Sequence, residues 1–512
     1  MVRGLTLLVL WVWAAAIRFL HLGSKPFWFD ECFSVEVARI RWSDFLHLLW
    51  WREANMALYY VLLRAWLSLN QHYWKSPFFI RSFSVVIAAA TLPAIYWLAG
   101  LLYDRRVALI AATLFAFNAY SVRYAQEARS YALFLLLATL SSGFLVSFLR
   151  ESSRRKWRGY VLVSILAVYA HFYALLLVAA QWLAVRWLGN FSQSEDETVA
   201  PSSQLRRAWF AVGLAALPLL VFVAKTGAGP IRWISRPGVR DVLEFYQHAA
   251  GGNNWVLLVI YAVACVAAVM PLGKQLFVRG LSSKTSSGTC WQTWRAQFLL
   301  IWLIFPVLLT VLLSFARPVF LGRYMIFCLP ALLILVAAGL ARLRTAWLLA
   351  AVLSGILLLG LQGVLFVYGN DFDGERDASG AASNFILHHS EPGDAVIFHI
   401  AATRVPYEFF RSVRAGENTA SPDFTRQLGP EILFPHHSAG LDYRDFTGKP
   451  TEDLLRAAGA SHARVWVMLM NNGSEEKPDA TTAMLMGVLS ESFPSVNRWK
   501  FTKVEVRLYG RP

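Results

Sequence analysis

The chain has 512 residues, of which 57% are hydrophobic and only 16% are charged, and its mean hydropathy is +0.46. Because a soluble domain carries about 25% charged residues, this composition excludes an ordinary soluble protein and predicts a polytopic membrane protein. The net charge of +16 requires no nucleic-acid partner, since cytoplasmic loops of membrane proteins are already rich in Lys and Arg. The scattered cysteines, Cys32, Cys265, Cys290 and Cys328, form no CxxC pattern and predict neither a metal knuckle nor a disulfide framework.

The expected membrane spans follow the apolar runs in chain order. Runs long enough to cross about 30 Å of hydrocarbon cover residues 5–22, 78–102, 107–122, 131–149, 208–224, 255–270, 298–315, 325–341 and 346–366. The run 160–188 is interrupted near His171 and is expected to form two short helices, which brings the number of spans to about eleven. The N-terminal run begins like a signal peptide but lacks a small-x-small cleavage pattern, so we expect it to remain as the first span.

The basic loops predict the orientation of these spans. The apolar run 57–69 is short for a span. If it does not cross, the basic segments 103–106, 150–158, 186–207, 274–295 and 342–344 all become cytoplasmic, as the positive-inside rule requires. We therefore expect run 57–69 in the outer interface and the N-terminus in the cytoplasm. The acidic pair at 30–31, the loops 123–130, 225–254 and 316–324, the turn at 171 and everything after 366 then share the outer face.

Residues 367–512 alternate between two kinds of pattern. Helix-like runs cover 376–389, 452–458 and 481–493, and strand-like runs cover 395–398, 463–469 and 504–508. This alternation predicts a small α/β domain. The expected organisation is a transmembrane domain of residues 1–366, with a first outer loop at 23–77 that carries interfacial helices, and an extracytoplasmic α/β accessory domain of residues 367–512.

Two adjacent acids, Asp30 and Glu31, follow a Phe-Trp-Phe run just past the first span. Carboxylates are costly to desolvate in such an aromatic setting, so the pair predicts a cation, a substrate or a reacting proton. The alternative is a structural one, in which Asp30 caps a helix that begins at Cys32. Asp30, Glu31 and Glu127 together could also form a loose site for a divalent cation.

Basic residues on the outer face form a second candidate group. The segment 123–131 contributes Arg123, Glu127, Arg129 and Tyr131. Outer arginines run against the positive-inside rule and predict a bound anion, for which a lipid phosphate is the natural candidate. The whole outer set is Arg123, Arg129, Lys225, Arg232, Arg236, Arg317 and Arg323. A helix-end arginine that merely snorkels to the interface is the alternative for each of them.

Several other polar side chains fall on the same face. Tyr324 follows Arg323 where a span begins, and we expect His171 and Tyr59 as walls of a cavity. The histidine pairs at 388–389 and 436–437 have no acids at ligand spacing and predict no metal site.

The order of these motifs resembles that of the GT-C glycosyltransferases. The resemblance rests on the acidic pair at 30–31, Leu-Tyr-Tyr at 58–60, Arg-x-x-Ser at 81–84, Gln-Glu-Ala-Arg-Ser-Tyr at 126–131, Tyr-x-His-x-Tyr at 169–173 and Gly-Arg-Tyr at 322–324. Over residues 5–340 the chain is similar to the bacterial family 39-like enzymes, which are related to protein O-mannosyltransferases and to the lipid A aminoarabinose transferase. Many relatives have Pro-Pro where this chain has Asn55-Met56-Ala57, which leaves the acceptor open.

The resemblance implies a GT-C fold in the bacterial inner membrane. It also implies transfer of a sugar from a polyprenyl-phosphate carrier to an acceptor protein or glycolipid at the membrane lipid surface. By motif, the catalytic group would be Asp30, Glu31 and Glu127, with Asp30 as general base. The substrate-binding group would be Arg123, Arg129, Tyr131, His171, Arg323, Tyr324 and Tyr59. The sugar, the acceptor and a divalent cation stay open.

The sequence disfavours two other functions of a polytopic membrane protein. A flippase or transporter of lipid-linked sugars would need polar residues buried in mid-span, and the apolar spans disfavour it. An inactive relative that serves as a binding scaffold is disfavoured because Asp30, Glu127 and Arg129 are all present.

Overall fold

The computed structural model describes residues 2–51, 53–70, 73–189, 202–227, 234–279, 287–370, 376–415, 429–435, 448–470 and 478–511. The chain forms two compact units. The first comprises Met1–His21, Ala54–Tyr59 and Arg81–Phe372, and the second comprises Leu22–Glu53, Tyr60–Ile80 and Asp373–Pro512. Most of the first outer loop therefore groups with the C-terminal residues, while the domain boundary at residue 366 stays a prediction.

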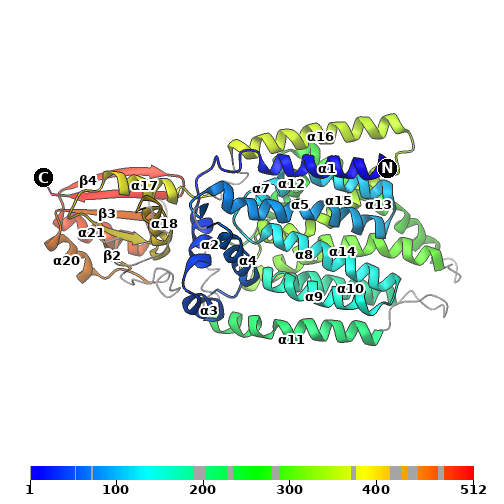
Figure 1. Ribbon diagram of the computed structural model, residues 1–512, viewed down its shortest axis with the longest axis horizontal. Coiled ribbons are helices and arrows are strands. Elements are labelled where there is room, and N and C mark those ends of the chain that lie inside the picture. Colours follow the sequence, from blue (N-terminus) through cyan, green and yellow to red (C-terminus); the bar gives the residue numbers. More distant parts are fainter. Residues whose placement is uncertain are drawn as a thin grey trace. The chain divides into compact units, whose positions relative to one another are not determined.

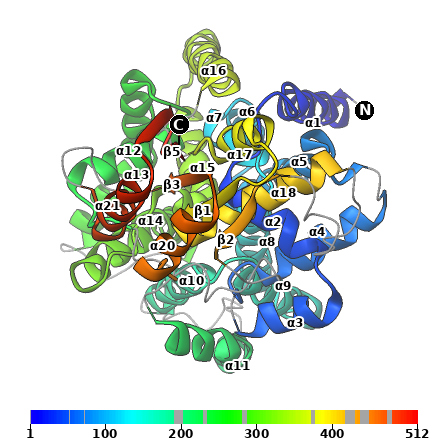
Figure 2. The ribbon, with the colours of Figure 1, turned by 90° about the vertical axis from the view of Figure 1, so that its left-hand side faces the viewer.

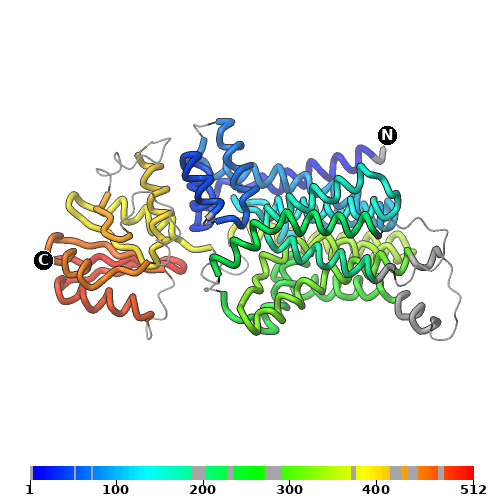
Figure 3. The backbone as a smooth tube through the Cα atoms, turned by 90° about the horizontal axis from the view of Figure 1, so that it is seen from below, coloured from blue at the N-terminus to red at the C-terminus, as the bar shows by residue number. Residues whose placement is uncertain are grey.

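The first unit is a bundle of helices that run side by side for most of their length (Figure 1, Figure 3). Its helices are α1 (Val2–Phe19), α6 (Arg105–Ala116), α7 (Ala119–Ala125), α8 (Tyr131–Arg150), α9 (Arg154–Ala170), α10 (Ala174–Gly189), α11 (Ser202–Thr226), α12 (Val239–Ala250), α13 (Trp255–Arg279), α14 (Ser287–Ala316), η3 (Gly322–Cys328), α15 (Leu329–Leu340) and α16 (Ala346–Gly369). Two further helices, α4 (Ala57–Ser68) and α5 (Pro77–Leu102), contribute residues to both units.

The helices have the length and apolar character of membrane spans. Among the described residues, six helices are long and apolar enough to cross a membrane, and the number rises to eight if each of two bent helix pairs is one span. The bent pairs are α6 with α7, at 59°, and α12 with α13, at 84°; two shorter apolar helices cover Gly4–Phe19 and Ala174–Arg186. The expected apolar runs fall on these helices and on α9, which has only 17 residues and begins with a basic turn. Run 5–22 extends past the end of α1 at Phe19, and run 325–341 extends one residue past the end of α15 at Leu340. The chain is a multi-pass helical membrane protein, as its composition predicts.

Neutral polar side chains hold part of the bundle together. Gln181 of α10 donates to Ser141 at 3.2 Å and to Ser142 at 3.1 Å, both on α8, and accepts from the Tyr160 hydroxyl of α9 at 2.9 Å. All of these groups are buried. The helices are thus less uniformly apolar than the sequence suggests. The network carries no charge, however, and its members bond one another, which is typical of helix association in membranes rather than of an ion path.

The second unit contains the expected α/β structure. Its elements are α2 (Phe29–Arg39), α3 (Trp42–Trp51), α17 (Ser379–His389), β1 (Ala395–His399), η4 (Ala401–Thr403), α18 (Arg404–Ala415), β2 (Glu431–Phe434), α20 (Glu452–Ser461), β3 (Arg464–Met470), α21 (Ala480–Ser492), β4 (Ser495–Phe501) and β5 (Val504–Gly510). The described strands form one five-stranded sheet in the order β2-β1-β3-β5-β4. Strand β1 pairs in parallel with β2 and β3, whereas β5 pairs antiparallel with β3 and β4.

Helices cover both faces of this sheet (Figure 2). Ala395 and Ile397 of β1 pack with residues of α20 and α21, whereas the alternate residues Val396 and Phe398 pack with α17. The period of two along a buried strand produces these two cores. Three elements escaped sequence prediction: β2 is only four residues long, β4 is an exposed edge strand, and α18 is rich in arginine.

Candidate functional site

The loop between α7 and α8 carries a buried ion pair. Arg123 Nη1 donates to Glu127 Oε1, and the two side chains are only 2% and 1% exposed. The sequence analysis named both residues but did not predict that they pair with each other, although they stand four positions apart. Because breaking such a pair would leave an uncompensated buried charge, the first role of Glu127 is to hold Arg123.

Contacts from three directions fix this loop. The Tyr120 hydroxyl of α7 donates to the Gly322 carbonyl of η3 at 2.8 Å. Gln126 Nε2 donates to the carbonyls of Arg18 and Leu20 at the end of α1, at 3.0 and 2.7 Å. The rings of Tyr124 and Tyr131 meet edge-to-face with centroids 5.0 Å apart. The loop is therefore a rigid part of the bundle.

His171 lies in the turn between α9 and α10, close to two arginines. Arg129 and Arg323 are 8% and 7% exposed, and His171 is completely buried. Burial, and after it the positive charges of Arg129 and Arg323, lower the pKa of His171 to about 3. The imidazole is consequently neutral at physiological pH. The structure thus brings together three residues that the sequence places more than forty positions apart.

The neutral imidazole has one free donor. Its Nδ1 accepts a hydrogen bond from the Tyr173 amide at 3.3 Å, which assigns the ring proton to Nε2. Nε2 is buried and has no hydrogen-bond partner among the described residues. A buried N–H without a partner costs about 1–3 kcal/mol, so this donor beside two cations suits an anionic ligand.

Aromatic rings enclose the imidazole. Phe134 stacks on it with centroids 5.0 Å apart and an interplanar angle of 9°, and Tyr324 lies at 4.9 Å. The predicted residue Tyr59 is buried in the first unit, and its hydroxyl is 3.1 Å from Ser84 Oγ. The predicted outer cations Lys225, Arg236 and Arg317 are exposed, not part of the buried group. Arg232 and the pair at 436–437 fall outside the described residues.

Asp30 and Glu31 lie in the second unit, in the first turn of α2. The helix begins at Phe29, so the interpretation of Asp30 as the cap of a helix starting at Cys32 is wrong. Glu31 is fully buried and Asp30 is half-buried. Acidic residues in a first turn interact favourably with the helix dipole. The helix dipole therefore explains why the fold tolerates the charges of Asp30 and Glu31, but it does not explain what function they serve.

A third carboxylate, which sequence analysis missed, contacts the same turn. Asp377 is 7% exposed, and its Oδ1 accepts from the Phe29 amide at 3.4 Å. Burial raises the pKa of Asp377, and the nearby negative charge of Asp30 raises it further. Nothing in the local sequence could have indicated this contact, because its partners are 348 residues apart.

A divalent cation has no ready site among these groups. Within the described ranges, no three His, Cys, Asp or Glu side chains are arranged to hold a metal ion. Glu127, one of the three carboxylates expected to form such a site, is paired with Arg123. The residues described therefore do not fit the loose divalent site that the sequence left open.

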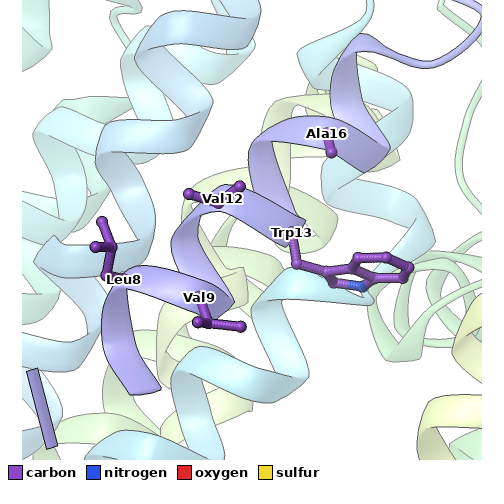
Figure 4. Close-up of a pocket in the computed structure, with 5 residues that line it drawn as sticks. All are labelled: Leu8, Val9, Val12, Trp13 and Ala16. Atoms are coloured by element: carbon purple, nitrogen blue, oxygen red, sulfur yellow. The ribbon is translucent and has the colours of Figure 1, made fainter. Parts of the chain in front are cut away.

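A cavity of about 320 Å³ lies along α1 (Figure 4). The residues that line it are apolar: Leu8, Val9, Val12, Trp13 and Ala16. None of them can bind a charge or transfer a proton. All five residues are exposed, so this space is an open apolar hollow on the surface of α1.

The apolar helix bundle with its broken helices and the five-stranded sheet of the C-terminal residues define a polytopic helical membrane protein with a C-terminal α/β structure. The chain is similar to the crystal structure of ArnT from Cupriavidus metallidurans in the apo state, with a TM-score of 0.60, 11% identity, and coverage of 98% of this chain and 97% of that one. The same protein bound to undecaprenyl phosphate gives a TM-score of 0.56 at 12% identity, with the same coverage.

A third solved structure is the Archaeoglobus fulgidus oligosaccharyltransferase in the apo form. Its TM-score is 0.47 at 10% identity, and the match covers 79% of this chain and 63% of that one. No model of a known protein family matches the chain, and no curated protein sequence does. The likeness to ArnT shows the fold alone, and it confirms the GT-C fold predicted from the sequence.

Proposed function

We propose that this protein is an integral-membrane glycosyltransferase that moves a sugar from a polyprenyl-phosphate carrier to an acceptor on the outer side of the membrane. The observation that carries the proposal is the buried group of Arg129, Arg323 and neutral His171, whose Nε2–H lacks a partner among the described residues. Arginine binds phosphate through charge-assisted hydrogen bonds. The similar structure of ArnT with undecaprenyl phosphate supports a polyprenyl phosphate as the anion.

The reaction would be a direct displacement at the anomeric carbon. Asp30 removes the proton of the acceptor hydroxyl. At the same time, the oxygen of that hydroxyl forms the new bond to the anomeric carbon. The bond from the carbon to the carrier phosphate breaks, and both of its electrons leave with the phosphate. The negative charge that grows on the phosphate oxygens is stabilised by Arg129 and Arg323. Glu31 supports Asp30 from the same turn of α2.

The remaining predicted residues would surround the substrate or hold in place the residues and helices that bind it. Glu127 holds Arg123 through the buried ion pair, so that the guanidinium presents its other donors in one direction. Tyr131 and Tyr324 are aromatic walls of the first unit. Tyr59 anchors α4 to α5 through its contact with Ser84.

Transfer in proteoliposomes tests this function. Wild-type protein would be reconstituted with an undecaprenyl-phosphate sugar and candidate acceptors, with and without EDTA, and release of undecaprenyl phosphate would be measured. We expect Asp30→Asn to lower the rate by about 100-fold or more, since general-base catalysis contributes about 10²–10⁴. Asp44→Asn, an exposed acid of α3, is the matched control and should leave the rate unchanged.

The outcomes separate the parts of the proposal. If Asp30→Asn transfers sugar at the wild-type rate, Asp30 is not the general base, although the protein would still be a glycosyltransferase. Failure of the wild type to bind undecaprenyl phosphate at all would contradict the function itself.

A further inference from the structure

We propose that Asp377 is a positioning residue, which caps α2 from a distant part of the chain and thereby holds Asp30 in place for the transfer reaction. This inference rests on the proposed function. It assigns to the C-terminal α/β structure a direct role in the acidic site of the second unit.

The helix that carries Asp30 has no cap of its own. Trp28 occupies the N-cap position and makes no side-chain cap bond. The Trp28 carbonyl accepts from the amides of Glu31 and Cys32, each at 3.1 Å. The Phe29 amide is also one of the first amides of the helix, which have no partner within the helix. Asp377 Oδ1 accepts from it, so a side chain from a distant part of the chain satisfies the first amide of the helix.

Asp377 is itself held firmly. The same Oδ1 accepts from the Ser379 amide at 3.0 Å. The neighbouring Ala378 amide donates to the Thr502 carbonyl, between β4 and β5, at 2.9 Å. The carboxylate is therefore fixed to the sheet, and the sheet in turn determines where α2 begins.

A second contact holds the chain just before α2. A Cβ atom added to Gly380 of α17 would lie 2.6 Å from the Phe27 carbonyl oxygen, so only glycine allows this close approach. The Phe27 ring meets Phe409 of α18 edge-to-face, with centroids 5.3 Å apart. Phe27, two residues before the residue that Asp377 contacts, is thus in contact with both α17 and α18.

Position matters here because Asp30 follows the capped residue directly. Loss of the cap would let the first turn fray, and the first turn contains both Asp30 and Glu31. A base misplaced by about 1 Å can cost about 100-fold in rate. Binding of the lipid phosphate, which we assign to residues of the first unit, should not change.

Three variants test the inference in the full-length protein in proteoliposomes. We expect Asp377→Ala to lower kcat by about tenfold or more and to leave the KM for the polyprenyl-phosphate sugar within about twofold. Asp377→Asn should restore most of kcat, because its side-chain carbonyl can still accept from the Phe29 amide. Asp479→Ala is the matched control, since Asp479 caps α21 by accepting from the amides of Thr481 and Thr482 at 2.9 and 3.3 Å; it should leave kcat unchanged.

Hydrogen exchange supplies a readout that does not depend on turnover. Amides in the first turn of α2 should exchange faster in Asp377→Ala than in the wild type, whereas those of α8 should not change. Wild-type kcat together with wild-type exchange in Asp377→Ala would overturn the inference. A wild type that transfers no sugar would instead contradict the proposed function, while unchanged exchange in the variant would still count against the cap.

Discussion

Arg18 of α1 donates through Nη2 to Ser121 Oγ of α7 at 2.6 Å. The same guanidinium donates to the carbonyls of Phe115 and Ala116, the last residues of α6, at 3.0 and 3.3 Å. The Arg18 residue is fully buried. At the break between α6 and α7, the last carbonyls of α6 have no amide of a continuing helix to bond, and Arg18 donates to them. Through Ser121, Arg18 also supports the loop that carries Glu127 and Arg129.

Replacement of Arg18 should destabilise the bundle strongly. Arg18→Ala would remove the donor to the Ala116 carbonyl and to Ser121 Oγ, and a buried group left unsatisfied costs about 1–3 kcal/mol. The Phe115 carbonyl would keep its bond from the Asn118 amide. We expect a clear fall in the temperature of unfolding in detergent, followed by intrinsic fluorescence. Arg41→Ala is the matched control, because Arg41 is 87% exposed in a surface ion pair worth about 0–1 kcal/mol. Equal melting of the two variants would contradict the structural role of Arg18.

The two buried arginines should contribute directly to phosphate binding. Arg129→Ala and Arg323→Ala each remove a charge-assisted donor, worth about 1.5–3 kcal/mol, and should weaken undecaprenyl-phosphate binding by at least tenfold. Binding to detergent-solubilised protein by scintillation proximity would measure the change. Arg317→Ala, at an exposed position just before the helical turn that carries Arg323, serves as control and should bind like the wild type. If both Arg129→Ala and Arg323→Ala bind undecaprenyl phosphate with wild-type affinity, the proposed phosphate site is wrong.

The neutral state of His171 predicts how stability changes with pH. Its folded pKa is lowered to about 3, whereas an unfolded histidine titrates near 6.5. Below about pH 6.5 the unfolded chain thus binds a proton that the folded protein does not, and stability falls with decreasing pH by up to about 1.4 kcal/mol per pH unit. This contribution is fully present above pH 6.5 and is lost as the pH falls towards 3.

The variant His171→Gln isolates that contribution. Its unfolding temperature should fall less between pH 7 and pH 5 than that of the wild type, whatever its stability at pH 7. Parallel pH curves for the two proteins would mean that His171 is not held neutral. The measurement requires no substrate.

The buried pair of Arg123 and Glu127 gives a further test. Glu127→Gln should cost about 3–5 kcal/mol of stability, because Arg123 would keep its charge in a buried site without its partner. Glu244→Gln breaks the exposed i,i+4 pair with Arg240, whose side chains are 90% and 38% exposed, and should cost less than about 1 kcal/mol. Thermal unfolding of both variants would compare them, and a mild effect of Glu127→Gln would argue against a structural pair.

Several features of this protein follow from the sequence alone. Hydropathy is a local property, so the apolar runs predict the helices of the bundle, including the break at His171 between α9 and α10. The helix and strand patterns after residue 376 likewise predict most of the α/β elements. They miss β2, β4 and α18, because a short strand, an exposed edge and an arginine-rich helix carry weak periodicity.

The tertiary structure alone decided which of the predicted residues meet. The sequence indicated that outer arginines bind an anion, but only folding separates buried Arg129 and Arg323 from the exposed Lys225, Arg236 and Arg317. It also joins Glu127 to Arg123 and brings Asp377 to the Phe29 amide across 348 residues. Residue type and spacing determine which helices form and which side chains carry charge. Contacts between distant segments depend on how those helices pack, and no local pattern encodes them.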